Sequence, residues 1–431
     1  MVPDFSIDLD SIGPEMIRLM TDLYPICRSI TGNGVRETLN ILKQYVPLTI
    51  TEVPSGTPVY DWTVPKEWNI KDAYIKNAKG EKIVDFKQNN LHILNYSTPI
   101  NQKMTLNQLK EHLFTIPDKS GWVPYRTTYY DENWGFCISH DQYQQLPDEE
   151  YRVFIDSTLD EGSLTFGELL IKGESTDEFL LSCHICHPSL CNDNLSGIAL
   201  NTFLARHLIG RPLKYSYRFL FIPGTIGSIT WLSLNKTNCS KIKHGLVVNC
   251  VGDSGKFIYK RTRQHLAEID RAAIYCLKNS GLEFEVIDFF PYGYDERQFC
   301  SPGFNLPVGC LSRSTHGSYP EYHTSADNFD IITPSNLTES FLVYHTVIDL
   351  VENNKKYRRT NPFCEPQLGK RGLYDKIGAR SNSKQNQLAM LWILNLADGD
   401  HSLLDMAERS GLDFSILKDI ALLLKKNGLV K

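Results

Sequence analysis

Short apolar runs alternate with helix-length segments from about residue 163 to residue 355. The spacing of apolar and polar positions predicts strands at Glu168–Lys172, Glu178–Ser182, Tyr217–Ile222, Leu246–Cys250, Phe284–Phe289 and Leu306–Leu311. It predicts helices at Leu195–Leu208, Ile226–Asn235, Leu266–Leu277 and Leu337–Val351. Strands that alternate with helices are typical of an α/β fold, so we expect a mostly parallel sheet flanked by helices. Such sheets bind ligands at the carboxyl ends of their strands.

The pattern differs before residue 163. Two helices are expected within residues 11–46, with a turn at Gly32-Asn33-Gly34 between them. Residues 57–162 are rich in Trp, Tyr, Pro and Asn, and they contain a predicted hairpin of Ala73–Lys76 with Lys82–Phe86 and one predicted helix, Leu106–Phe114. We therefore predict a discontinuous α/β domain over residues 1–56 and 163–358, interrupted by an inserted α+β domain over residues 57–162.

The C-terminal part predicts a separate small domain. Residues 361–375 contain several Pro and Gly residues and are expected to form a linker. A helix near Gln385–Leu396, a glycine turn at Gly411 and a helix at Phe414–Lys426 then form the pattern of a helix-turn-helix. Ten Lys and Arg residues stand against eight Asp and Glu residues over 365–431, so binding to nucleic acid is disfavoured. We expect this part to bind a protein partner or a second copy of the chain.

The amino-acid composition excludes several classes of protein. The chain has 431 residues and a net charge of −5, so bulk charge does not hold it to nucleic acid or acidic lipid. No apolar run approaches the roughly 18 residues that a membrane span needs, and the first residues do not resemble a signal peptide. The eleven cysteines are expected to be reduced thiols, which indicates a cytoplasmic protein without a membrane segment.

The densest group of chemically useful residues follows the predicted strand Glu178–Ser182. His184, His187 and Asp193 lie within ten residues, and two imidazoles with a carboxylate are ligand types that zinc prefers. In the alternative interpretation, the histidines form hydrogen bonds in a tight turn and Asp193 is a helix N-cap. A thiolate site made by neighbouring cysteines is less favoured, because no second Cys pair of suitable spacing follows.

Three later segments also follow predicted strands. His323 comes after Leu306–Leu311 and is expected to reach the first group, with Asp327 holding its second ring nitrogen. Asp253 follows the strand Leu246–Cys250 and is either a ligand or a turn former. The segment after Tyr217–Ile222 contains no ionisable side chain.

Taken in chain order, these segments resemble the motifs of the co-catalytic zinc aminopeptidases. Asn192-Asp193-Asn194-Leu195-Ser196-Gly197 is similar to the motif at one helix start of that family, and Tyr322-His323-Thr324-Ser325-Ala326-Asp327 is similar to its last motif. The whole chain resembles one branch of aminopeptidase-like proteins, which have an inserted α+β domain and a C-terminal winged helix. That branch is linked to modified polysaccharide biosynthesis. The resemblance therefore implies a winged helix-turn-helix domain over residues 366–431.

The resemblance implies roles for individual residues. His184 and His323 match zinc ligands, Asp193 matches the carboxylate that bridges two metals, and His187 is an additional candidate ligand. Gly224-Thr225 replaces a Glu-Glu pair that normally supplies a general base and a ligand for the second metal. We therefore expect one zinc ion. Asp253 is displaced from its counterpart by two residues, and Glu321 and Glu296 are the remaining candidates for a base.

These observations predict a zinc-binding aminopeptidase-like metallohydrolase that acts on a small peptide or an amide-bearing metabolite. Its hydrolysis is expected to be impaired, because glycine at position 224 supplies no base. Two alternatives stay open. One is a non-hydrolytic ligand-binding or scaffolding protein in cell-surface carbohydrate biosynthesis, with an amino-sugar-type ligand. The other is a metabolite-sensing regulator that uses the winged helix.

Overall fold

The computed structural model describes residues 8–373 and 383–431, and these divide into two compact units. The described residues of the first unit are 8–270 and 282–342, and those of the second are 271–281 and 343–373 together with 383–431. The first seven residues, which were expected not to form a signal peptide, and the last two residues of the predicted linker lie outside the described residues. The predicted boundaries of the inserted and C-terminal domains stay predictions.

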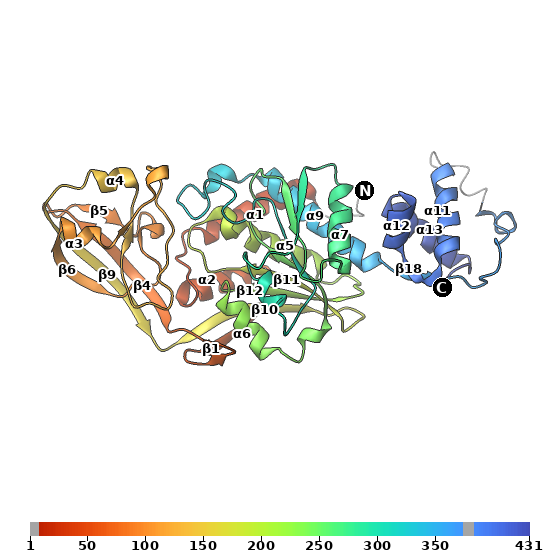
Figure 1. The fold of residues 1–431 in the computed structure, drawn as a ribbon, viewed down its shortest axis with the longest axis horizontal. Helices are drawn as coiled ribbons and strands as arrows, with labels where there is room; N and C mark the ends of the chain where they lie inside the picture. The colour runs from red at the N-terminus through yellow and green to blue at the C-terminus, as the bar shows by residue number, and fades with distance from the viewer. Residues whose placement is uncertain (1–7, 374–382) are drawn as a thin grey trace. The chain divides into compact units, whose positions relative to one another are not determined.

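An eight-stranded sheet is the centre of the first unit (Figure 1). In spatial order its strands are β1 (Thr49–Pro54), β10 (Ser163–Ile171), β12 (Ser216–Ile222), β11 (Glu178–His184), β13 (Ile242–Val248), β16 (Val308–Ser312), β14 (Phe257–Lys260) and β15 (Phe284–Ile287). The four central strands β12, β11, β13 and β16 are parallel to their neighbours in that group. Antiparallel pairs of β1 with β10, β10 with β12 and β14 with β16 flank them, so the sheet is mixed around the predicted parallel core.

Burial explains why the central strands were predictable. Every residue of β11 and of β12 is buried, which is typical of strands covered on both faces. The predicted helices are present as α5 (Gly197–Leu208), α6 (Ile226–Leu234), α7 (Glu268–Lys278) and α9 (Pro334–Asn353), and the two N-terminal helices are α1 (Leu9–Leu23) and α2 (Asn33–Leu42). Helix α5 packs on β11, and α1 packs on α5. The parallel strands therefore end side by side, with His184 of β11 opposite Ile222 of β12.

A second, four-stranded antiparallel sheet lies within residues 57–162. Its order is β5 (Lys82–Asp85), β4 (Glu67–Lys76), β9 (Glu150–Asp160) and β6 (Ile100–Thr105). The predicted hairpin is confirmed, since Tyr74 pairs with Asp85. The helix predicted at Leu106–Phe114 is shorter than expected, because α3 (Leu106–Lys110) ends early and β7 (Leu113–Phe114) pairs with β8 (Phe136–Cys137). A small hairpin of β2 (Pro58–Val59) and β3 (Trp62–Thr63) precedes this sheet, and the short helix α4 (His140–Gln144) follows β8.

Three helices and a two-stranded sheet form most of the second unit. They are α11 (Ser383–Leu396), α12 (Leu403–Ser410), α13 (Phe414–Lys426), β17 (Lys356–Arg358) and β18 (Asp398–Ser402). The predicted turn between the last two helices is present, and Gly411 adopts a φ of 67° there. Leu404 and Leu417 are fully buried in this unit. None of the helices described in either unit is long and apolar enough to cross a membrane.

Candidate metal centre

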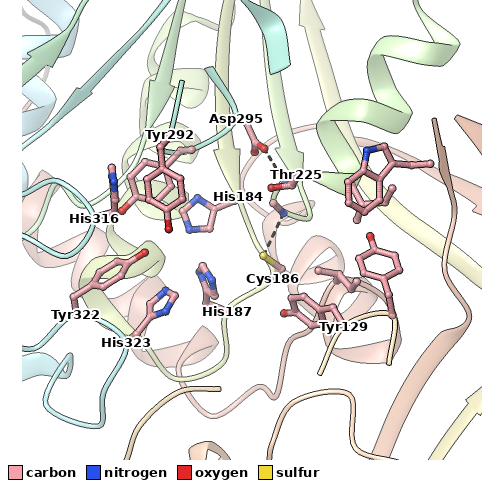
Figure 2. Close-up of a pocket in the computed structure, with 17 residues that line it drawn as sticks. Tyr129, His184, Cys186, His187, Thr225, Tyr292, Asp295, His316, Tyr322 and His323 are labelled. Carbon is pink, nitrogen blue, oxygen red and sulfur yellow. Dashed lines mark hydrogen bonds between the residues drawn. The ribbon is translucent and has the colours of Figure 1, made fainter. Parts of the chain in front are cut away.

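Two histidines lie at and just beyond the carboxyl end of β11, where they line a cavity of about 330 Å³ (Figure 2). His184 is the last residue of the strand, and its ring stacks on Tyr294 at a centroid distance of 5.3 Å. His187 follows after a short turn, and its ring stands nearly perpendicular to that of His184, at 88°. The buried Arg28 donates a hydrogen bond of 2.9 Å to the main-chain oxygen of His187 and so fixes the turn.

Asp193 brings the histidines together. Its side chain is fully buried, and the Nε2 atom of His184 lies 2.8 Å from its Oδ1. The Nε2 atom of His323 lies 3.0 Å from Oδ2, and the Nδ1 atom of His187 lies 3.7 Å from Oδ1. The carboxylate thus faces three imidazoles. Helix α5 has Ser196 as its N-cap, and the carboxylate of Asp193 contacts the histidines, so the alternative that Asp193 only caps a helix is wrong.

Asp327 positions the segment that carries Asp193. Its carboxylate accepts hydrogen bonds from the main-chain N–H groups of Asn192, at 2.6 Å, and Asp193, at 3.0 Å. The hydroxyl of Tyr319 donates a third hydrogen bond, at 3.1 Å. Burial raises the pKa of Asp327 to about 7. Among the described residues, the ring of His323 is hydrogen-bonded to Asp193 and not to Asp327, so the expectation that Asp327 holds this ring is wrong.

The donor atoms around Asp193 fit a metal ion. Nδ1 of His187 is buried and has no hydrogen-bond partner among the described residues, although an unpaired buried nitrogen is costly. Donor atoms of His184, His187 and Asp193 all lie within 4.8 Å of one another. Burial lowers the pKa of His187 well below its ordinary value, which favours the neutral form that binds metals. Burial opposes ionisation of Asp193, but His187 and His184 outweigh it and hold the pKa of Asp193 well below the usual range.

The other predicted site residues lie elsewhere. Asp253 accepts hydrogen bonds from Nδ2 of Asn192, at 2.8 Å, and from the N–H of Gly255, at 2.9 Å, so its carboxylate serves a turn and not the histidines. Glu296 is buried and pairs with the ammonium of Lys260 at 2.7 Å. Glu321 does not belong to the described lining of the cavity. The structure therefore brings neither predicted base to the cluster.

A carboxylate that was not predicted from the sequence lies beside Gly224-Thr225, the segment that replaces the Glu-Glu pair. Asp295 lines the cavity, and its Oδ1 accepts a hydrogen bond from the N–H of Thr225 at 2.8 Å (Figure 2). The same oxygen accepts a second hydrogen bond, at 2.9 Å, from the hydroxyl of Ser228. Burial raises the pKa of Asp295. The N–H of Gly224 donates to Sγ of Cys186 at 3.2 Å. Asp295 lies directly before the short helix α8 (Glu296–Phe299) and belongs to no sequence motif. The only feature of the sequence that could have indicated it is its position after a predicted strand.

The segment that carries His323 is paired with residues 123–125. The N–H of Tyr125 donates to the main-chain oxygen of His323 at 2.8 Å, and the N–H of Ser325 donates to the oxygen of Val123 at 2.8 Å. The ring of Tyr125 contacts the ring of His323 edge-on, with centroids 5.1 Å apart. The ring of Tyr322 stacks on the face of the His323 ring, with centroids 4.0 Å apart. Residues within the predicted insertion therefore fix the third histidine.

Family models cover most of the chain. Residues 17–354 match the family described as a domain of unknown function, DUF4910. Residues 355–431 match the winged helix-turn-helix family, so the predicted winged helix is confirmed.

Individual proteins are similar over nearly the same extent. A Clostridium acetobutylicum protein, named provisionally as a polysaccharide biosynthesis protein with an aminopeptidase-like domain, is 55% identical over 94% of this chain and 93% of its own length. A crystal structure from the same organism, of a provisional peptidase, is 52% identical over 98% of both chains, with a TM-score of 0.93. A zinc aminopeptidase from Bacillus subtilis shares the fold, with a TM-score of 0.58 at 12% identity over 80% of this chain and 94% of its own.

The two family models together with the relative that is 55% identical show the family of the chain. The chain belongs to the DUF4910 family of aminopeptidase-like proteins that carry a C-terminal winged helix.

Proposed function

We propose that the chain binds one zinc ion through His184, His187, Asp193 and His323 and hydrolyses an amide bond in a small molecule. The observation that carries this proposal is the convergence of three imidazoles on the buried carboxylate of Asp193. Imidazole and carboxylate groups are the donors of catalytic zinc sites, and an ion held by them polarises a carbonyl group and activates water.

Two carboxylates that do not bind the metal have separate roles in the proposed reaction. Asp327 fixes the main chain of Asn192 and Asp193, so the carboxylate of Asp193 keeps its orientation when a substrate enters. In this proposal Asp295 takes the place of the absent base. Its Oδ1 is occupied by Thr225 and Ser228, and its Oδ2 has no partner among the described residues and is the atom that accepts the proton of water. A raised pKa brings a carboxyl group nearer to the value that suits general base catalysis.

Metal content tests the first part of the proposal. Purified protein is loaded with zinc, dialysed and measured by elemental analysis, beside His323→Ala and the control Glu321→Gln. We expect about one zinc per chain in the wild type and the control, and a clear loss in His323→Ala. Protein that retains no zinc would refute the proposal. Turnover is then measured with panels of aminoacyl anilides and N-acylated amino sugars.

A second candidate is a zinc-containing ligand-binding protein without hydrolysis. The observation that favours it is the Gly224-Thr225 segment, which carries no carboxylate at the end of β12. A Cβ atom at position 224 would lie 3.3 Å from Sγ of Cys186 and 3.5 Å from Cβ of His184, so a larger residue fits after a small shift. Ligand binding without turnover in the wild type, and turnover gained in Gly224→Glu, would favour this candidate over the first.

None of the residues that line the described cavity belongs to the winged helix. We propose that it binds a protein or a second copy of the chain, as its nearly balanced charge suggests. Sedimentation of the full chain over a range of concentrations tests for self-association. Titration with duplex DNA at low salt tests the regulator alternative.

A further inference from the structure

The wall of the cavity contains aromatic rings that the proposed hydrolysis does not use. Trp62, Tyr130 and Tyr292 line the cavity and are 44%, 50% and 60% exposed. Trp62 and Tyr130 also lie together, with ring centroids 5.4 Å apart. Large rings that remain this exposed beside a cavity indicate a surface that a ligand covers.

The backbone supports a specific role for one of these rings. Tyr130 has a φ of 70°, in the left-handed region that side chains other than glycine rarely adopt. Such strain persists only where the surrounding structure imposes it, and it concentrates at functional sites. Here the strained residue is one of the rings that meet at the cavity. Trp62 comes from the short β2–β3 hairpin, so two separate segments deliver these adjacent rings to the same place.

The chemistry of the lining selects among ligands. No lysine or arginine belongs to the described lining, which disfavours a phosphate or a carboxylate as the recognised group. Five of the lining residues are tyrosines, namely Tyr129, Tyr130, Tyr292, Tyr294 and Tyr322. Tyrosine and tryptophan combine an apolar face with a polar tip. A pyranose ring has the matching character, since its C–H faces stack on aromatic rings while its hydroxyl groups form hydrogen bonds.

We propose that Trp62 and Tyr130 form a subsite for a pyranose ring, which places an N-acyl substituent of that sugar toward the histidines of the same cavity. Only the second part of this inference, the placement of the N-acyl substituent, rests on the proposed function, because stacking of a sugar on the two rings does not require zinc. It assigns the substrate to N-acylated amino sugars. A peptide with an aromatic side chain is the competing ligand.

Binding to the zinc-free protein tests the subsite separately from hydrolysis. Isothermal titration uses methyl glycosides of glucose, galactose, N-acetylglucosamine and N-acetylgalactosamine, with N-acetylphenylalanine amide as the competing probe. We expect at least one glycoside to bind with or without zinc. Trp62→Ala and Tyr130→Ala should each weaken it roughly tenfold, whereas Trp62→Phe retains most of the affinity. Phe363→Ala, which removes an aromatic ring that is 79% exposed and outside the cavity lining, is the matched control and should change nothing.

Two results would overturn the inference. One is the absence of glycoside binding while N-acetylphenylalanine amide binds. The other is glycoside binding that is unchanged in both alanine variants. Because Trp62 and Tyr130 are exposed, their substitution leaves the cores intact, and an unchanged melting temperature of each variant verifies this. If the zinc-free protein binds sugar but the zinc-loaded protein hydrolyses no amide, the proposed function is refuted and the subsite stands.

Discussion

The ends of two adjacent parallel strands in this protein differ in chemistry. After β11, His184 and His187 meet the carboxylate of Asp193, so metal-binding groups are concentrated there. After β12, Gly224 and Thr225 provide no ionisable side chain, and a carboxylate reaches them only from Asp295 in a distant loop. The contrast teaches that, in the proposed function, holding a metal and accepting a proton depend on separate segments of this chain. Each segment can therefore be changed without the other.

Removal of Asp193 should produce the largest effect. Asp193→Ala takes away the carboxylate that faces all three histidines, so we expect zinc affinity to fall roughly 100-fold or more. Competition with a chelator of known affinity measures this. Glu321→Gln serves as the control, because that side chain lies outside the described cavity lining. Undiminished zinc binding in Asp193→Ala would show that the cluster is not a metal site.

Asp295→Asn tests the other side of the comparison. The amide oxygen of Asn still accepts hydrogen bonds from Thr225 and Ser228, but the side chain no longer accepts a proton. We expect zinc content to be unchanged and any amide hydrolysis to fall about 100-fold. Single-turnover rates and elemental analysis on the same preparation distinguish the two effects. A loss of zinc together with activity would contradict the separation of roles.

Asp327→Asn should have a smaller effect on the metal side. An Asn side chain keeps one acceptor oxygen, but its amino group faces an N–H group where the carboxylate accepted a hydrogen bond. The turn that carries Asp193 should loosen, and zinc affinity should fall roughly tenfold. Chelator competition again provides the measurement, and Asp330→Asn, in a neighbouring exposed position, is the control. An affinity equal to that of the wild type would mean that this turn is held by other contacts.

His244→Gln should leave the cavity unaffected and change only the stability of the sheet. His244 lies within β13, and burial lowers its pKa to about 4. The native protein keeps this histidine neutral, whereas the unfolded chain takes up a proton below about pH 6.5. The free energy of unfolding should therefore fall by roughly 3 kcal/mol from this group as the pH drops from about 6.5 to about 4.

The variant isolates that contribution. Urea unfolding of both proteins at several pH values should show a shallower fall for His244→Gln, with zinc content the same as in the wild type. Parallel pH curves for the two proteins would show that His244 is solvated in the native state.

The sequence predicted the parts of the fold in which pattern and burial agree. The strands β11 and β12 are buried throughout and mostly apolar and were located nearly to the residue, and α13 was located at its true ends. β1 was missed because Val53 is its single buried residue. β14 was missed because it is only four residues long and contains a buried lysine, Lys260, whose charge is compensated by a partner far along the chain.

The site was predictable to the extent that its residues are close in sequence. His184, His187 and Asp193 form a local cluster, and His323 was added because its segment follows another strand of the same sheet, with the resemblance to a known motif in support. Asp295 could not be found in this way, because only the packing of its loop against Thr225 and Ser228 reveals it. The pairing of Trp62 with Tyr130 was equally hidden, since the two residues lie 68 positions apart and only packing brings their rings together.

The short pairing between residues 123–125 and 323–325 has a consequence for how the protein can be shortened. Pro124 and Thr324 form an isolated bridge there, flanked by the hydrogen bonds of Tyr125 and Ser325. A trimmed protein from which residues 57–162 are deleted would lose the strand-like anchor of His323 together with the cavity-lining rings of Trp62 and Tyr130. Residues 57–162 thus hold part of the cavity in place, and a protein reduced to its sheet and helices would keep His323 in its sequence but lose the contacts that fix its position.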